Sequence, residues 1–420
     1  MNTSASARGR LTWLLFFGCS LGSAAYIAGA TIGAIVAKEL TGQAAFAGVP
    51  GALYLLGSAV AAYPAARFME HTGRRAGLSL GFVVGIGGAI VAGFAVLAHS
   101  FAGFLLGFAL MGASQGFSDL GRYAAAEMHP VAERARAISL VVLGGTVGAI
   151  AGPALVGPMG RVAESFQRDP LAGPWFASAA LFALGLLLTY FLLRPDPRDL
   201  GRQLDAQHAA TLADAGQPGE VRPLRAILRQ PGTQVAVLAM SLGQLVMVMV
   251  MAITSVYMKD HGHSLDEVSL VIMAHTLGMF GLSVVAGRLA DNLGRAPVIV
   301  AGCGLLIAAC LIAPLVHETY LLALALFLLG LGWNFCYVAG GALLTDTLTL
   351  AERGRMQGSN DVVIALVSAA GNLGSGLLFA AFGYTLMAWV SLAVTLVPLA
   401  FAFNLIVSRG RVRAAESSGN

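Results

Sequence analysis

Long apolar runs separated by short polar segments extend along almost the whole chain. Twelve of these runs are close to the length of a membrane-crossing helix, at about 11–37, 46–66, 77–98, 101–121, 137–158, 174–193, 232–258, 266–287, 297–316, 319–343, 362–382 and 385–407. A helix of about 20 apolar residues spans the hydrocarbon core of a bilayer. The pattern therefore predicts an all-α integral membrane protein with twelve transmembrane helices.

The one long polar segment divides these twelve runs into six and six. It covers residues 194–231 and is rich in Arg, Asp, Pro and Gly, which is typical of a flexible linker. We therefore expect an N-terminal six-helix half at 1–193, a cytoplasmic linker at 194–231 and a C-terminal six-helix half at 232–420. Arg8 and Arg10 before the first run resemble the start of a signal peptide, but the internal repeat requires that run as a helix.

The two halves repeat each other weakly in sequence. Lys38-Glu39 recurs as Lys259-Asp260 and EHTGRR (70–75) recurs as DNLGRA (291–296), both at an offset of 221 residues. AERARA (132–137) recurs as AERGRM (351–356) at an offset of 219 residues. A parallel repeat of six-helix halves predicts a transporter that works by alternating access, with its site near the membrane midplane between the halves.

Composition and charge agree with this topology. The chain is 57% hydrophobic and 11% charged, whereas about 25% of the residues in a soluble protein are charged. Of 25 Lys and Arg residues, the predicted helices leave four on one side of the membrane, namely Lys38, Arg161, Arg168 and Lys259. The positive-inside rule then places both termini in the cytoplasm. The net charge of +4 thus reflects orientation and gives no reason to expect a nucleic-acid partner.

The loop GRLADNLGR (287–295) resembles the signature loop of the major facilitator superfamily, which lies between the second and third helices of each half. Its first-half copy, ARFMEHTGRR (66–75), has Glu70 where the family has Asp and Ala66 where the family has Gly. The resemblance implies the fold of that superfamily over the whole chain. We expect Glu70, Arg74, Asp291 and Arg295 to form charge pairs that latch one conformation.

Few ionisable residues lie inside the predicted helices, and such residues are candidates for function in a membrane. Asp119 and Arg122 are three residues apart at the cytoplasmic end of the fourth helix, where either a structural pair or a coupling site fits the spacing. GAIAGPALVG (148–157) resembles the glycine-proline motif of drug–proton antiporters, although small residues also allow close helix packing. The arginine that those proteins place in the fourth helix is replaced by Gly112.

Methionines form a stripe along the seventh predicted helix. At 100° per residue, Met240, Met247, Met251 and Met258 lie on one narrow face. His275 and Met279 share a face of the eighth helix, at a depth close to that of Met247 and Met251. Such a stripe is often core packing, but thioether and imidazole groups at one level also form a soft ligand set, which favours Cu(I).

These residues resemble the paired signature of the CcoA-type copper importers, which are bacterial inner-membrane members of the same superfamily. The resemblance implies a metal-binding set of Met247, Met251, His275 and Met279 in a protein that imports copper as its substrate. We expect a monomer without a cofactor. It makes a cytoplasmic copper chaperone a candidate partner, beside the lipid bilayer. Further groups could extend the metal path, namely Met240, Met258, Cys19, His261 and His263.

Two other functions fit the same pattern. An organic-solute carrier, importing riboflavin or exporting drugs, could stack a flat ring on Tyr26, Tyr54, Trp333 or Tyr337. A copper sensor or assembly factor would bind the metal without moving it. The sequence contains no constellation of nucleophile, base and orienting group, so we do not expect an enzyme.

Overall fold

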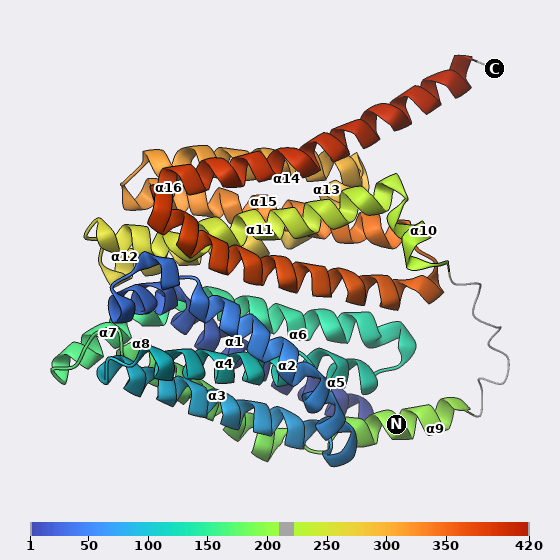
Figure 1. Cartoon of the computed structure of the whole chain (residues 1–420). Coiled ribbons are helices and arrows are strands. Elements are labelled where there is room, and N and C mark those ends of the chain that lie inside the picture. Colours follow the sequence, from blue (N-terminus) through green and yellow to red (C-terminus); the bar gives the residue numbers. More distant parts are fainter. Residues whose placement is uncertain (1, 210–221, 419–420) are drawn as a thin grey trace. The chain divides into compact units, whose positions relative to one another are not determined.

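The described residues of the computed structural model, 2–209 and 222–418, form helices and connecting turns without a β-strand (Figure 1). Among them, 11 helical stretches are long and apolar enough to cross a membrane. The last stretch, α16 (Leu350–Ser418), contains two helices that meet at Gly383, where φ is +77°. The predicted all-α fold is therefore confirmed, with the last two predicted helices merged across this glycine.

The chain divides into two compact units. Unit 1 lies within Met1–Gly216 together with Ser264–Ser269, and unit 2 lies within Gln217–His263 together with Leu270–Asn420. The elements of unit 1 are α1 (Asn2–Thr41), η1 (Ala44–Phe46), α2 (Val49–Thr72), α3 (Arg74–Leu97), α4 (Phe101–Ser118), α5 (Gly121–Glu127), α6 (Val131–Ala151), η2 (Pro153–Leu155), α7 (Val156–Ser165), α8 (Gly173–Leu187), η3 (Leu188–Leu192) and α9 (Pro197–Ala209). Most of the remaining elements belong to unit 2: α10 (Leu224–Leu228), α11 (Pro231–Asp260), α12 (Leu265–Phe280), α13 (Ser283–Leu293), α14 (Arg295–Ile312), η4 (Ala313–Leu315), α15 (Thr319–Asp346) and α16.

Glycines let the helices of unit 1 approach backbone to backbone. A Cβ atom added at Gly148 of α6 would lie 2.0 Å from the carbonyl oxygen of Ser20 in α1, and one at Gly152 would lie 2.6 Å from that of Ala24. A Cβ atom at Gly112 of α4 would lie 2.0 Å from the carbonyl oxygen of Tyr54 in α2. Small residues are needed at such contacts because membrane helices associate through close packing. The glycine-proline stretch thus forms the contact between α1 and α6.

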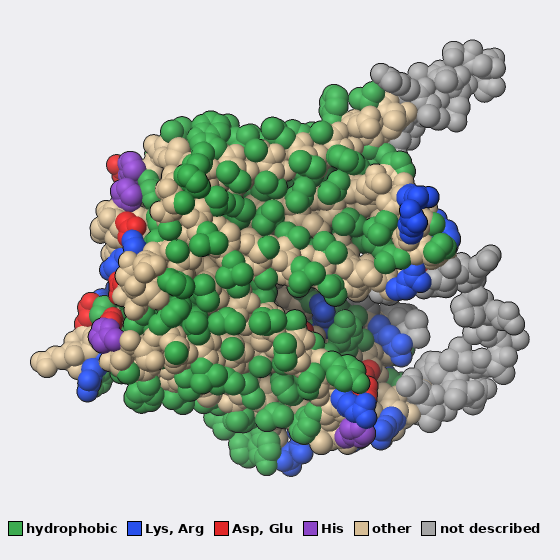
Figure 2. Space-filling view, viewed as in Figure 1, with side chains coloured by type: hydrophobic (Ala, Val, Ile, Leu, Met, Phe, Trp, Pro, Cys, Tyr) green, Lys and Arg blue, Asp and Glu red, His purple; other side chains and the backbone are tan. Residues whose placement is uncertain are grey.

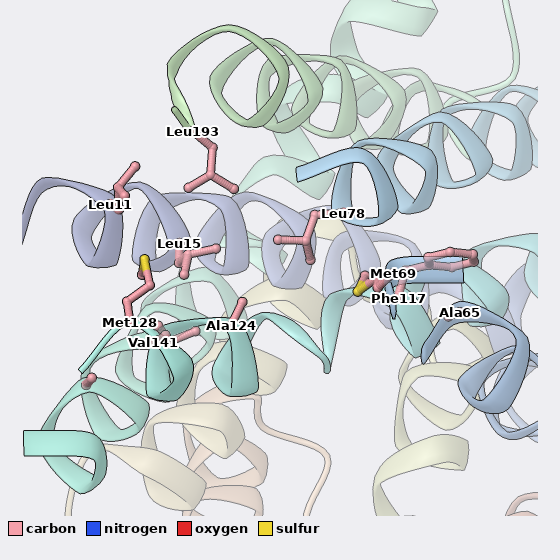
Figure 3. Packing of buried hydrophobic residues seen from close by; sticks show 12 residues of the cluster. Leu11, Leu15, Ala65, Met69, Leu78, Phe117, Ala124, Met128, Val141 and Leu193 are labelled. Carbon is pink, nitrogen blue, oxygen red and sulfur yellow. The ribbon is translucent and has the colours of Figure 1, made fainter. Parts of the chain in front are cut away.

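A hydrophobic cluster fills one end of unit 1 and holds the ends of α1, α2, α4 and α6 together (Figure 3). Its members are buried and mostly aliphatic: Leu11, Leu15, Ala65, Met69, Leu78, Phe117, Ala124, Ala125, Met128, Ala137, Val141 and Leu193. On the visible face of each unit, hydrophobic side chains cover the middle of the helices and charged side chains lie near the helix ends (Figure 2). This distribution is what a bilayer requires of the residues that contact it.

The linker differs from the predicted flexible segment because both of its flanks are folded. Asp196 accepts hydrogen bonds from the backbone N–H groups of Arg74 (3.1 Å) and Arg75 (3.0 Å), which caps the first turn of α3. On unit 2, Arg222 donates to the buried carboxylate of Glu352 at 2.6 Å. The predicted linker residues 210–221 lie outside the described residues. Each flank is therefore held on its own unit.

Candidate functional site

Unit 1 has a break in a membrane-spanning helix. Helix α4 ends at Ser118 and α5 begins at Gly121, so that Asp119 and Leu120 form a turn between them. Broken helices are a common feature of transporter sites, because the freed backbone and its side chains can meet a ligand or an ion. The candidate site of unit 1 is therefore the group of side chains around this break.

Tyr54 of α2, Gln115 of α4 and Asp119 of the break form a hydrogen-bonded chain. The Tyr54 hydroxyl donates to Oε1 of Gln115 at 3.1 Å, and Nε2 of Gln115 donates to Oδ1 of Asp119 at 2.7 Å. The Tyr26 ring of α1 stacks on the Tyr54 ring with centroids 3.7 Å apart and planes at 13°. We call this set the Tyr54–Gln115–Asp119 chain. It gives unit 1 a flat aromatic surface beside polar groups.

The sequence allowed either a structural pair or a coupling site for Asp119 and Arg122, and no salt bridge joins these two side chains within the described part of unit 1. The Arg122 guanidinium lies over the Tyr123 ring, 5.0 Å from its centroid, and its Nε atom is buried without a hydrogen-bond partner. Gln115 binds Asp119 instead. Gln115 was not expected from the sequence, although its spacing of four residues from Asp119 places both side chains on one helix face.

Unit 2 contains a second stacked aromatic pair. The rings of Trp333 and Tyr337 on α15 lie 4.9 Å apart at 24°, and Nε1 of Trp333 donates to Oε1 of Gln244 on α11 at 2.6 Å. Tyr337 is 37% exposed, whereas Trp333 is 9% exposed. Each unit therefore combines a parallel aromatic pair with a glutamine amide. Gln244, like Gln115, was not expected from the sequence.

Most of the methionine stripe lies in the core of unit 2. Met240, Met247 and Met258 are 3%, 5% and 0% exposed, and Met251 is partly exposed. Met240 packs between α15 and α16: a Cβ atom at Gly340 would lie 2.8 Å from its Cγ, and Nδ2 of Asn360 lies 3.7 Å from its sulfur. These contacts are those of a flexible side chain that fills space between helices.

His275 and Met279 lie on the face of α12 that packs against α15. His275 is fully buried, and its Nδ1 lies 2.9 Å from the carbonyl oxygen of Leu326. The carbonyl can only accept, so Nδ1 carries the hydrogen, and the Nε2 lone pair has no partner among the residues that the structure describes. A Cβ atom at Gly330 of α15 would lie 3.2 Å from Cγ of Met279. The set of Met247, Met251, His275 and Met279 stays a prediction.

The secondary path residues contact separate partners. At the end of α11, the His261 ring stacks on His317 with centroids 5.0 Å apart, and Nδ1 of His263 lies 3.2 Å from the Thr319 hydroxyl. Cys19 belongs to unit 1, where it lines a small cavity with Phe82, Ser118 and Thr189 among others. No group of three His, Cys, Asp or Glu side chains within the described ranges is arranged to hold a metal ion. His317 was not expected from the sequence.

The expected latch residues form pairs, but one partner differs. Asp291 and Arg295 are joined at 2.5 Å, and Arg295 also reaches Asp346 at 3.2 Å. In unit 1, Nε of Arg74 donates to Glu127 at 2.9 Å, while Glu70 is exposed and offers its backbone carbonyl to Arg198. Glu127 and Asp346 are 219 residues apart, as in the third sequence repeat. In both units, an arginine at the first residue of one helix thus pairs with an acid at the last residue of another helix.

Comparison with known proteins identifies both the family and the fold. The model of the Major Facilitator Superfamily matches residues 13–264 and 235–419. The chain is 38% identical to the MFS-type transporter YdeG of Bacillus subtilis, over 93% of this chain and 90% of that protein. It is 32% identical to the riboflavin transporter RfnT of Brucella anthropi, over 94% of this chain and 96% of that protein.

Solved structures agree in fold. A bacterial homologue of the human lysosomal transporter Spinster, in its inward-facing and occupied conformation, superimposes with a TM-score of 0.72. The two chains are 15% identical, and 96% of this chain and 97% of that chain are covered. This likeness concerns the fold alone.

Proposed function

Because the chain belongs to the major facilitator superfamily of membrane transporters, we propose that it carries a flat heteroaromatic solute, of which riboflavin is the type, across the membrane. It is a multi-pass membrane protein and not an enzyme. The transporter RfnT, similar to this chain over almost the whole length of both, supports riboflavin as the first solute to test. An organic solute, which the sequence allowed as an alternative, thus replaces copper as the proposed substrate.

The observation that carries the proposal is a parallel aromatic pair next to a glutamine amide in each unit. The Tyr26–Tyr54 pair adjoins Gln115, and the Trp333–Tyr337 pair adjoins Gln244. Aromatic faces bind a flat ring by stacking, and amide and hydroxyl groups bind its polar edge by hydrogen bonds. A neutral ring system needs few buried charges, which agrees with the small number of ionisable groups in these helices.

We further propose import into a bacterial cytoplasm through the inner membrane by alternating access. The uneven distribution of Lys and Arg supports cytoplasmic termini. In this orientation, the helix ends that carry Arg74 and Arg295 face the cytoplasm, together with the Lys and Arg residues near them. Alternating access by movement of two six-helix halves is the usual mechanism of folds built from such repeats.

One observation favours copper as a second candidate. The Nδ1–H of His275 is fixed on a backbone carbonyl, and its Nε2 lone pair is buried and unpartnered, which is the arrangement of many metal-bound histidines. Against copper, Met240, Met247 and Met258 are buried among the helices of unit 2. Copper uptake is therefore the competing outcome of the experiment.

The experiment measures riboflavin exchange in vesicles that contain the purified protein. We expect exchange in the wild type and its loss in Tyr26→Ala and Trp333→Ala, since each change removes one stacking surface. Tyr320→Ala is the matched control, because Tyr320 is 81% exposed at the start of α15. Absence of exchange in the wild type would overturn the proposal. Copper uptake that is lost in Met251→Ala and His275→Ala would establish the second candidate.

A further inference from the structure

The Tyr54–Gln115–Asp119 chain has a defined order of donors and acceptors. An ionised Asp119 can only accept, so the group of Gln115 that faces it at 2.7 Å is the amide NH2. The Gln115 oxygen must then face Tyr54, and the Tyr54 hydroxyl must donate its single proton to that oxygen at 3.1 Å. The charge on Asp119 therefore fixes the direction of both hydrogen bonds.

A proton on Asp119 would reverse this order. A protonated carboxyl has one O–H group to donate, and it would donate to Gln115 once the amide turns over and presents its oxygen. The amide NH2 would then face Tyr54 and donate to the phenol oxygen. The hydroxyl proton of Tyr54 would be free to turn toward a ligand. One proton enters at Asp119, the amide and hydroxyl rotate, and no other proton is gained or lost.

The surroundings of Asp119 suit a group that changes its charge. It lies at the break between α4 and α5 and is exposed, so a proton can reach it. The titratable groups that interact with it electrostatically are Cys19 of α1, Tyr54 of α2 and Arg122 of α5. Helix α3, which packs closely on α4, carries charged groups only at its first two residues, Arg74 and Arg75. Arg122 is a cation close to Asp119, and its Nε atom has no hydrogen-bond partner among the described residues.

We propose that Asp119 is the proton-coupling group of the transporter, and that its protonation frees the Tyr54 hydroxyl proton from Gln115 so that Tyr54 can donate it to the solute. This inference rests on the proposed function, because the solute is taken to be a flat ring with carbonyl groups on its edge. The protonated protein binds such a carbonyl more tightly, and loss of the proton weakens the bond. A proton gradient would thereby drive the solute in the direction in which protons flow.

Infrared difference spectroscopy during a pH titration tests the reversal without any solute. The carboxyl band that disappears in Asp119→Asn and the tyrosine band that disappears in Tyr54→Phe are assigned first. In the wild type we expect both bands to change with one midpoint. In Gln115→Met the carboxyl band should still titrate while the tyrosine band stays constant. A wild-type tyrosine band that does not respond when Asp119 is protonated would overturn the proposal.

Asp119→Asn gives a second test that does not depend on Gln115. Asparagine has no proton to gain or lose in this pH range, so the Tyr54 band should stay in one form at every pH. A Tyr54 band that still titrates in Asp119→Asn contradicts the proposed control of Tyr54 by Asp119. Glu164→Gln, a carboxyl-to-amide change at an exposed residue of α7, is the matched control and should behave like the wild type.

Riboflavin measurements then connect the reversal to transport. The wild type should bind riboflavin about three- to tenfold more tightly at a pH below the infrared midpoint than at a pH above it, because one hydrogen bond contributes about this factor. The affinity of Asp119→Asn and Gln115→Met should not depend on pH. Asp119→Asn should keep riboflavin exchange but lose accumulation driven by a pH gradient. An affinity of the wild type that is constant, or higher above the midpoint, overturns the coupling role.

Failure of the proposed function gives a different result. If the wild type exchanges no riboflavin, riboflavin is not its solute, whereas the infrared bands still decide whether Asp119 controls Tyr54. If riboflavin is exchanged but the two bands titrate independently, the proposed function stands and the coupling role of Asp119 is rejected.

Discussion

In unit 1 the stacked aromatic pair is linked through Gln115 to the carboxylate of Asp119, whereas in unit 2 the Trp333–Tyr337 pair is linked to the neutral amide of Gln244. The positions of unit 2 that lie 219 and 221 residues after Asp119 hold Val338 and Gly340, in the middle of α15. Two copies of one six-helix design thus carry different chemistry. The aromatic pair of unit 1 is therefore linked to the titratable Asp119, whereas the aromatic pair of unit 2 is linked to an uncharged amide.

The broken helix also differs between the units. Unit 1 interrupts the helix pair α4 and α5 at Asp119, while the corresponding α15 of unit 2 runs without a break from Thr319 to Asp346. Unit 2 is interrupted between α12 and α13, where Asn334 donates to the carbonyl oxygen of Met279 (2.6 Å) and to the hydroxyl of Ser283 (2.8 Å). A break with an exposed acid can exchange protons with water. The amide of Asn334 that holds the break in unit 2 does not titrate.

The largest expected effect is a loss of stability, caused by a substitution at Gly112, where α4 contacts the backbone of Tyr54. Gly112→Val would force a side chain against the backbone of Tyr54, where even a Cβ atom would lie 2.0 Å from the carbonyl oxygen. We expect a loss of about 3 kcal/mol in stability, at the upper end of overpacking effects, measured by thermal unfolding in detergent. Gly87→Val is the control, because nothing lies within 4 Å of a Cβ atom at Gly87. Equal unfolding temperatures for the two variants would refute the close contact.

The paired arginines should differ in importance between the units. The Arg74 side chain is 15% exposed and binds Glu127, whereas Arg295 is 24% exposed and its partners Asp291 and Asp346 are 70% and 53% exposed. We expect Arg74→Ala to cost about 2 kcal/mol, as for a partly buried charged hydrogen bond. Arg295→Ala should cost less than about 1 kcal/mol, as for a surface pair. Unfolding temperatures measured side by side would reveal a reversed order.

Glu352 should give unit 2 a pH dependence of its own. The Arg222 guanidinium and two backbone N–H groups lower the pKa of Glu352 well below its ordinary value of 4.5. A lowered folded-state pKa stabilises the fold above the unfolded-state pKa, and this stabilisation is lost as the pH falls below about 4.5 toward the folded-state value. Acid unfolding of Glu352→Gln should therefore depend less on pH than that of the wild type. The repeat position Glu133 is exposed, and Glu133→Gln should leave the wild-type profile unchanged.

The smallest effect concerns the orientation of the unit 2 pair. Trp333→Phe keeps an aromatic face but removes the hydrogen bond to Gln244. We expect riboflavin to bind about three- to tenfold more weakly, with the pH dependence of binding retained. If riboflavin binding to Trp333→Phe no longer depends on pH, part of the proton coupling lies in unit 2, and the two units do not differ in this respect.

Local sequence signals predicted the helices well but did not show which side chains pair with one another. The apolar runs located the membrane-spanning segments, because each such helix must satisfy its own backbone and bury apolar residues of a fixed length. The repeats also identified Arg74 and Arg295 as paired groups. Their acidic partners Glu127 and Asp346 were missed, since each lies more than 50 residues away along the chain and carries no motif of its own.

The sequence by itself determined the family, the all-helical fold and the division into two repeated halves, because all three depend on hydrophobicity and on short motifs with fixed spacing. Only the tertiary structure decided which side chains meet. It directed most of the methionine stripe into packing within unit 2, and it joined Gln115 to both Tyr54 and Asp119. The direction in which a helix face points depends on the neighbouring helices, and no local pattern along the chain encodes it.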